Sequence, residues 1–130
     1  RRCGVDYLNL INSVGNGLVV DAKRETPVIK PKGGFGGLGG SLIKPVALAN
    51  VRAFWKLLDG RIPIIGTGGV VQGVDAFEHV LCGASAVQVG TALVEEGVGV
   101  FERLERELAA ELAMRGKQSL EECRGKLKEL

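Results

Sequence analysis

Glycine stands beside small polar residues at several points of this chain, a combination that suits phosphate binding. Thr67-Gly68-Gly69 and Gly90-Thr91 each follow a short apolar run, and residues 33–40 form a third glycine-rich stretch. Because glycine has no side chain, backbone N–H groups beside it can approach an anion closely, and a following helix N-terminus adds its positive dipole. Either turn alone could be a tight connection, but the two in succession predict a phosphate site.

The residues of several other kinds of site are missing. The cysteines are widely spaced without a CxxC pair, and a single histidine without an HExxH sequence leaves little material for a metal site, so no metal is expected. No P-loop sequence occurs, which excludes that type of nucleotide site. Residues 34–39 match GxGxxG spacing poorly and follow a lysine-rich segment rather than a buried strand, which argues against a dinucleotide fold.

Short apolar runs alternate with helical patterns and predict the elements that position these turns. Strands are expected at residues 5–11, 62–66 and 86–89, and helices with one apolar face before, between and after the last two of these strands. Pro45 suits the first turn of the first helix, and Gly83 is placed to end the second. The expected apolar faces are Leu48, Val51, Trp55 and Leu58 in the first helix, Val74, Phe77 and Leu81 in the second, and Phe101, Leu104, Leu108 and Leu112 in the third. Alternation of strands and helices with short connections predicts a parallel sheet with right-handed crossovers. Every predicted strand ends in a small or polar residue beside glycine, and ligands of parallel α/β folds bind at that end. The turns should therefore lie on one rim.

The fold class predicted is α/β, as the C-terminal part of a TIM (β/α)8 barrel with about three βα units. Three units cannot close an eight-stranded barrel, which usually needs about 250 residues, so a small open sheet is the alternative. Residues 18–21 and 27–30 flank a polar turn and predict an inserted β-hairpin, and residues 33–40 are expected to be a loop. The chain has no initiator methionine, so we expect residues 1–130 to be one portion of a longer single domain.

The amino-acid composition is that of a folded domain, and it argues against some classes of binding partner. Of the 130 residues, 45% are hydrophobic and 25% are charged, which is typical of a globular protein with a core. A net charge of +2 argues against nucleic acid or a membrane surface as partner. No apolar run approaches the roughly 18 residues that a membrane span needs. Unpaired cysteines are typical of a reducing compartment.

Four stretches together resemble dihydroorotate dehydrogenase, and most closely its soluble, fumarate-using class (class 1A). They are residues 11–17, residues 29–40, residues 65–70 and residues 88–93, in the order and at the spacing of that family, and the closing residues 124–127 also match. The resemblance implies an FMN-containing β/α barrel that oxidises dihydroorotate to orotate in pyrimidine synthesis. It also implies a cytoplasmic homodimer that passes its electrons to fumarate.

The resemblance assigns roles to particular residues. Asn12 and Ser13 would bind the pyrimidine ring of the substrate, with Ser13 and the Ile11 backbone also near the flavin. The residues expected around the FMN ribityl phosphate are Gly40, Thr67, Gly68, Gly69, Gly90 and Thr91. A flavin carries out the hydride step, and the protein supplies anchoring and orientation. The family's cysteine base, flavin-contacting lysines and several substrate asparagines belong to earlier segments, so no catalytic residue is expected here and the piece alone should be inactive.

Two alternatives remain open at this stage. Another phosphate-binding barrel enzyme, such as an isomerase of amino-acid synthesis, would share the glycine turns but would lack the Asn12-Ser13 turn and the hairpin. A non-catalytic barrel fragment would keep the sheet without the chemistry. Bound flavin in the intact protein would exclude this last alternative.

Other residues of chemical interest are expected to have ordinary roles. Lys30, Lys32 and Lys44 should be solvated charges, although they could steer an anionic substrate. His79 falls off the apolar stripe of its helix and is expected at the surface, whereas Trp55 falls on the apolar face of the preceding helix and is expected in the core.

None of the three cysteines is expected to be the catalytic base. A base must lie within about 3 Å of the proton it takes, hence on the rim where the strands end. Cys3 precedes its strand, Cys82 lies near a helix C-terminus, and Cys123 is expected in a charged tail helix.

Overall fold

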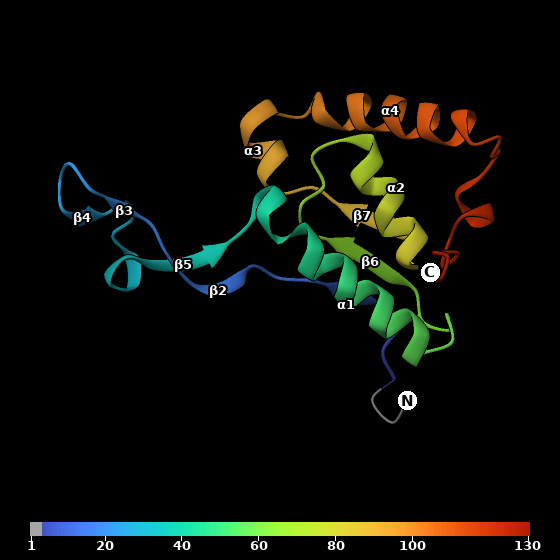
Figure 1. Ribbon diagram of the computed structural model, residues 1–130, viewed down its shortest axis with the longest axis horizontal. Helices are drawn as coiled ribbons and strands as arrows, with labels where there is room; N and C mark the ends of the chain where they lie inside the picture. Colours follow the sequence, from blue (N-terminus) through green and yellow to red (C-terminus); the bar gives the residue numbers. More distant parts are fainter. Residues whose placement is uncertain (1–3) are drawn as a thin grey trace.

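A three-stranded parallel sheet stands at the centre of the computed structural model, which describes residues 4–130 (Figure 1). Its strands lie in the order β1 (Leu8–Leu10), β6 (Ile64–Thr67) and β7 (Ala86–Gln88). Leu8 pairs with Ile64, and Ile65 pairs with Ala86. The predicted parallel strands are confirmed, each somewhat shorter than its apolar run.

Helix α1 (Lys44–Leu57) precedes β6 in the chain, and α2 (Gly73–Cys82) follows it. Helices α3 (Thr91–Glu96) and α4 (Val100–Met114) follow β7. Pro45 stands in the first turn of α1, and Gly83 ends α2 with a φ of 122°, as the sequence predicts. Phe101 is 50% exposed, so placing it on the apolar face of the last helix was wrong. The buried stripe of α4 begins one residue earlier, at Val100, and continues through Leu104.

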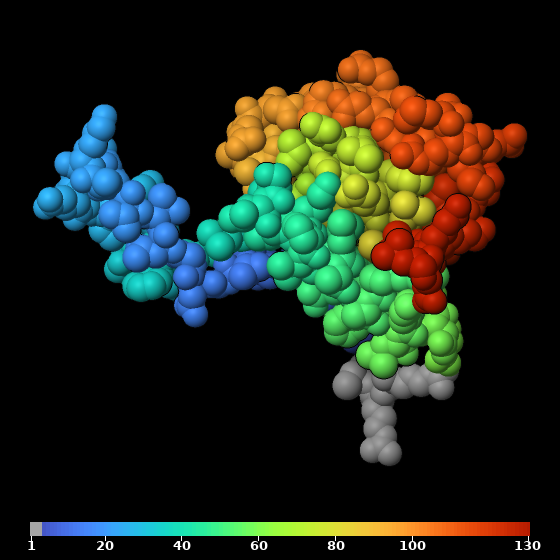
Figure 2. All heavy atoms as spheres, viewed as in Figure 1, coloured from blue at the N-terminus to red at the C-terminus, as the bar shows by residue number. Residues whose placement is uncertain are grey.

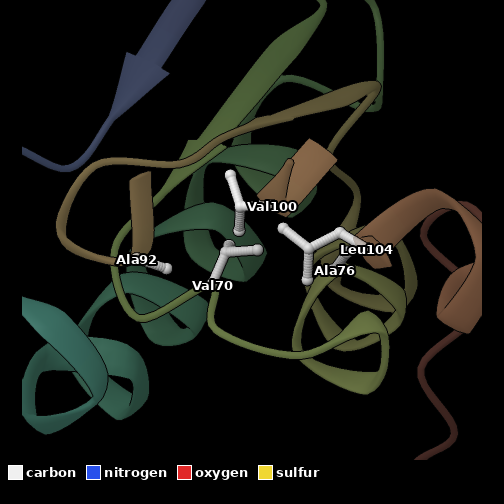
Figure 3. Packing of buried hydrophobic residues seen from close by; sticks show 5 residues of the cluster. All are labelled: Val70, Ala76, Ala92, Val100 and Leu104. Atoms are coloured by element: carbon white, nitrogen blue, oxygen red, sulfur yellow. The ribbon is translucent and has the colours of Figure 1, made fainter. Parts of the chain in front are cut away.

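Three buried clusters hold these elements together. The first joins α2, α3 and α4, where Val70 and Ala76 meet side chains from the last two helices (Figure 3). The second lies between α1 and the sheet and includes Val51 and Ile64, with Trp55 packed at its edge. One face of the sheet is therefore covered by helices. The opposite face carries the exposed side chains of Asn9, Ala86 and Gln88.

The third cluster corrects the expected tail helix. Cys123 is buried against Phe77 and Val80 of α2, just after a short 3-10 turn, Leu120–Glu122. Residues 115–130 thus turn back over α2 rather than extending α4 (Figure 1). The sequence did not predict that the tail turns back, because the residues around Cys123 are mostly charged and its apolar partners lie more than forty residues earlier in the sequence.

An arm of antiparallel strands projects from this body (Figures 1 and 2). Strand β2 (Val14–Leu18) pairs with β5 (Phe35–Leu38), and at the tip β3 (Val20–Asp21) pairs with β4 (Thr26–Pro27). Part of the glycine-rich stretch is therefore a strand and not the predicted loop. Its glycines permit close contact between segments: a Cβ on Gly37 would overlap the side chain of Ser13. No helix among residues 4–130 is long and apolar enough to span a membrane.

Gly83 and Gly116 each follow a helix end, and comparing them distinguishes the cost of backbone strain from the cost of a steric clash. Gly83 (φ +122°) leaves no room for a Cβ against the Trp55 ring, whereas Gly116 (φ +64°) has open space around it. We expect Gly116→Ala to lower the free energy of unfolding of the intact protein by about 1 kcal/mol, and Gly83→Ala by about 3 kcal/mol, because the second also overpacks the core. Denaturant unfolding measures both. Equal losses would contradict the packing of Trp55.

Candidate functional site

A cleft of about 160 Å³ lies at the carboxyl ends of the three parallel strands. The nine residues predicted for the site all line it: Ile11, Asn12, Ser13, Gly40, Thr67, Gly68, Gly69, Gly90 and Thr91. Sequence reasoning missed five further lining residues: Gly39, Ile43, Val70, Val71 and Gln88. The structure therefore brings together four segments of the chain that lie between Ile11 and Thr91 in the sequence.

One end of the cleft is built where the chain leaves β1. The Ile11 N–H donates to the Thr67 carbonyl at 2.8 Å, which holds this segment beside the end of β6. The Asn12 Oδ1 accepts from the Ser13 N–H at 2.7 Å. Among residues 4–130, the NH₂ group of Asn12 has no acceptor, so it is available to a ligand.

Bare backbone forms the wall at Gly68 and Gly69. Their φ values are +126° and +76°, which side-chain-bearing residues rarely adopt. Behind this wall the packing is close, because a Cβ on Gly69 would overlap Lys44 and one on Gly68 would lie 2.9 Å from the Ala47 Cβ. Within the described chain neither N–H group has a protein acceptor, so both are free to bind an anion.

The third side of the cleft is formed by Gly90, Thr91 and the turn at Gly40. A Cβ on Gly40 would lie 3.6 Å from the Thr91 Cγ2, so two segments far apart in sequence are in contact here. Gly90 has an ordinary φ of −111° and open space around its Cα. It therefore exposes backbone to the cleft and leaves room there for a side chain.

A polar trio below the cleft was also missed. One side chain from each parallel strand takes part: the Asn9 Nδ2 donates to the Gln88 Oε1 at 2.7 Å, and the Thr67 hydroxyl lies 2.5 Å from the Asn9 Oδ1 and 3.1 Å from the Gln88 Oε1. These contacts hold the Thr67 side chain against its neighbours. An asparagine between two leucines of a short strand was the signal, since alternate residues face opposite sides of a sheet.

An ion-pair cluster supports the loop after β6 from behind. The Lys44 Nζ lies 2.6 Å from Asp75 Oδ1 and 2.8 Å from Glu78 Oε2, so Lys44 is not the solvated charge expected. The Asp75 Oδ2 accepts from the N–H groups of Val71 and Gln72. Hydrogen bonds to both carboxylates raise the pKa of Lys44. Burial alone would raise the pKa of Asp75, but the hydrogen bonds that it accepts lower it overall.

His79 is fully buried, so the expectation of a surface histidine was wrong. Its Nε2 lies 3.1 Å from the Gly68 carbonyl oxygen, directly behind the cleft wall. The stripe of Val74, Phe77 and Leu81 predicted a single buried face, but α2 packs against α4 on one side and against α1 and the loop on another. Burial lowers the pKa of His79, although its hydrogen bond with Gly68 opposes this.

The cysteines of the described chain lie away from the cleft. Cys82 is buried against Val51 and Ile64, and burial raises the pKa of its thiol. Cys123 is buried under α2, and Cys3 lies outside the described residues. That none of the three is the base remains a prediction. Residues 4–130 contain no group of three His, Cys, Asp or Glu side chains that could hold a metal ion.

Comparison with known proteins identifies the family. The family model for dihydroorotate dehydrogenase matches residues 1–112 of the 130. The chain belongs to the dihydroorotate dehydrogenase family. The resemblance carried by the sequence motifs is thereby confirmed.

Individual members of the dihydroorotate dehydrogenase family are similar over nearly the whole chain. The dihydroorotate dehydrogenase (fumarate) of Kluyveromyces lactis is 59% identical over 126 residues, which cover 97% of this chain and 40% of that protein. The probable dihydroorotate dehydrogenase A (fumarate) of Enterococcus faecalis is 62% identical over 124 residues, which cover 95% and 40%. This chain thus spans about two fifths of the length of these curated relatives.

A solved structure shares the fold as well. The ligand-free DHODH of Eimeria tenella superposes with a TM-score of 0.76 at 27% identity, over 95% of this chain and 33% of that one. The α/β architecture with a parallel sheet is therefore that of part of a dihydroorotate dehydrogenase.

The ion-pair cluster makes a prediction for stability and its pH dependence. We expect Asp75→Asn to lower the free energy of unfolding of the intact protein by about 2 kcal/mol near neutral pH, because a buried charged acceptor is lost. The pKa of Asp75 is lowered from 3.8, so its contribution is complete above that value and is lost as the pH falls through the lower folded value. The difference between the two proteins should therefore shrink in acid.

Urea unfolding from neutral pH down to the acid limit of folding measures this difference. Glu129→Gln is the matched control, since Glu129 forms an exposed pair with Lys56 and the substitution should leave the free energy of unfolding nearly unchanged. A difference for Asp75→Asn that stays constant in acid would contradict the charged role of this carboxylate.

Proposed function

We propose that this chain is the C-terminal part of an FMN-dependent dihydroorotate dehydrogenase. The whole protein would oxidise dihydroorotate to orotate in de novo pyrimidine synthesis, with fumarate as electron acceptor. The observation that carries the proposal is the convergence of all nine motif residues on one cleft. The test is made on the intact protein: a flavin absorption spectrum, and orotate formation that depends on fumarate. A colourless protein with an intact fold would instead support a non-catalytic barrel.

The cleft fits the phosphate end of FMN. Its lining contains no acidic side chain, and three of its segments present glycine backbone. The N–H groups of Gly68, Gly69 and Gly90 have no acceptor among residues 4–130, so their dipoles can balance a phosphate charge. Thr91 adds a hydroxyl group at the same edge. FMN, when bound, accepts the hydride that leaves the substrate.

The other end of the cleft fits the pyrimidine ring. The side-chain amide of Asn12 can donate and accept hydrogen bonds, which matches a ring with adjacent carbonyl and N–H groups. Ser13 presents a hydroxyl group beside it, and the Ile11 backbone lies where the strand ends. These residues orient the substrate, and the base that takes its proton belongs to the part of the enzyme that precedes them.

In the complete barrel, this chain would supply about three βα units, with the β2–β5 arm as an insertion. The order β1–β6–β7 supports this assignment. The sheet face that carries Asn9, Thr67 and Gln88 would line the barrel interior. We also propose that the whole protein is a cytoplasmic enzyme that acts as a homodimer, as the resemblance implies. The arm exposes Val19, Val28 and Phe35, apolar surface that a second subunit or the rest of the barrel would bury.

Gly90 offers a direct test of the phosphate site. Its φ is negative and nothing lies within 4 Å of a Cβ built there, so Gly90→Val has room for a branched group that would stand against the anion. We expect the intact variant, freed of flavin, to bind FMN at least about tenfold more weakly in a fluorescence titration, since a lost hydrogen bond to a charged group costs about 1.5–3 kcal/mol. Gly99→Val, also in open space but outside the cleft, should bind FMN as the wild type does. Unchanged FMN affinity in Gly90→Val would refute the phosphate assignment.

Asn12 tests the substrate end separately. Asn12→Ala removes a side-chain amide, so we expect orotate affinity to fall by about tenfold or more while FMN content is unchanged. Equilibrium dialysis of orotate with the intact protein measures the affinity. Asn50→Ala is the control, because the Asn50 side chain bonds only within α1, to the Val46 carbonyl. Unaltered orotate binding in Asn12→Ala would show that this residue does not contact the ring.

A further inference from the structure

The buried imidazole of His79 occupies a space that the sheet keeps open for it. The side chain is 0% exposed and lies between α2 and β6. Gly66 in β6 makes the room, because a Cβ there would overlap the His79 Nδ1. A glycine inside a strand often marks close approach of another group, and here that group is the imidazole of His79.

The surroundings of the His79 ring determine which of its two nitrogens carries the proton. The Gly68 carbonyl can only accept, so the Nε2 at 3.1 Å must carry the hydrogen. The Nδ1 is buried and has no partner among residues 4–130. A neutral imidazole with the proton on Nε2 satisfies both conditions, since an unpaired lone pair is less costly to bury than an unpaired charge.

This single bond sets the direction of a neighbouring donor. The peptide between Gly68 and Gly69 is planar and trans, so its N–H points opposite to its C=O. His79 holds the C=O toward α2, and the N–H of Gly69 therefore points away from α2. Gly69 lines the cleft, so this donor is fixed at its wall.

The loop needs such support because it cannot support itself. Two consecutive glycines have many accessible backbone conformations and no side chains to anchor them. Helix α2 supplies the anchors from positions four apart, on one helical face. His79 donates to the Gly68 carbonyl, and the Asp75 carboxylate accepts the N–H groups of Val71 and Gln72. The loop is thus held at both ends by groups of opposite hydrogen-bonding character.

We propose that His79 is a positioning residue of the phosphate site, which orients the Gly69 N–H toward a phosphomonoester without touching it. The inference rests on the proposed FMN site and adds a residue that lies outside the cleft. It implies that loss of the Nε2 donor lets the Gly68–Gly69 peptide rotate, so the site loses affinity for the phosphate group and keeps its affinity for the rest of the ligand.

The test compares two ligands that differ only in that group. The intact protein, freed of flavin, is titrated with FMN and with riboflavin, and flavin fluorescence gives the two dissociation constants. His79→Leu removes the donor at similar volume, and we expect the preference for FMN over riboflavin to fall about tenfold, with riboflavin affinity unchanged. His79→Gln should restore most of the preference, because its amide nitrogen can reach the position of Nε2.

Other outcomes would overturn the inference. Equal losses for both flavins would indicate a general packing role, and an unchanged preference would show that the bond to Gly68 does not orient the donor. A wild-type protein that does not prefer FMN to riboflavin would instead refute the proposed phosphate site itself. Should His79→Leu fail to fold, nuclear magnetic resonance of the wild type decides: the Gly69 amide must shift with FMN and not with riboflavin, and the His79 proton must lie on Nε2.

Discussion

The parallel pairing of β6 with β1 on one side and β7 on the other is the constraint on which the site depends. Parallel strands end at the same edge, so three segments that follow them must meet there. The register of the pairing is equally important. With Leu10 opposite Gly66 and Thr67 opposite Gln88, the polar trio faces away from α1 and the apolar residues face it. A shift by one residue would reverse every side chain.

Helix α2 fixes the conformation of the loop that follows β6 at this edge of the sheet. It is buried on two sides, where Phe77 and Val80 contact the tail and α4 while Asp75 and His79 face the loop. Core packing and loop geometry are therefore coupled through one short helix. A Cβ on Gly73 would overlap the backbone at Leu108, which shows how closely α2 packs against α4.

The sequence was most informative where a pattern is local. Apolar runs ending in glycine predicted the strands, their parallel order and the cleft, because the end of a strand and the start of the next turn are adjacent residues. It failed where the partner is distant. Lys44 forms an ion pair with Asp75, which lies thirty-one residues away in the sequence. Cys123, in the C-terminal tail, packs against Phe77 of α2. Strand β5 was missed because glycine has low strand propensity, and only pairing with β2 makes it a strand.

The histidine error has a different cause. A helical pattern with one apolar stripe describes a helix at a surface, and any residue off the stripe is then expected in solvent. In α2 the second buried face is polar, with the Asp75 carboxylate and the Nε2 of His79 hydrogen-bonded to the backbone of the loop. Polar residues can be core residues when unpaired backbone groups lie opposite them. Glycine-rich loops provide such unpaired backbone groups, so a polar helix face beside such a loop can be expected to be buried.

The two ends of the cleft differ in what would hold a ligand. At the Asn12 end side chains would make the contacts, so a substitution would act through the residue that is changed. At the Gly69 end backbone N–H groups would make them, so the influential side chains would be those that fix the backbone from behind. The N–H donors do not titrate, and among residues 4–130 no charged side chain lines this cleft. The titratable side chains nearest the Gly69 end belong instead to the layer behind it, where the lowered pKa of Asp75 favours a charged carboxylate and the lowered pKa of His79 favours a neutral imidazole.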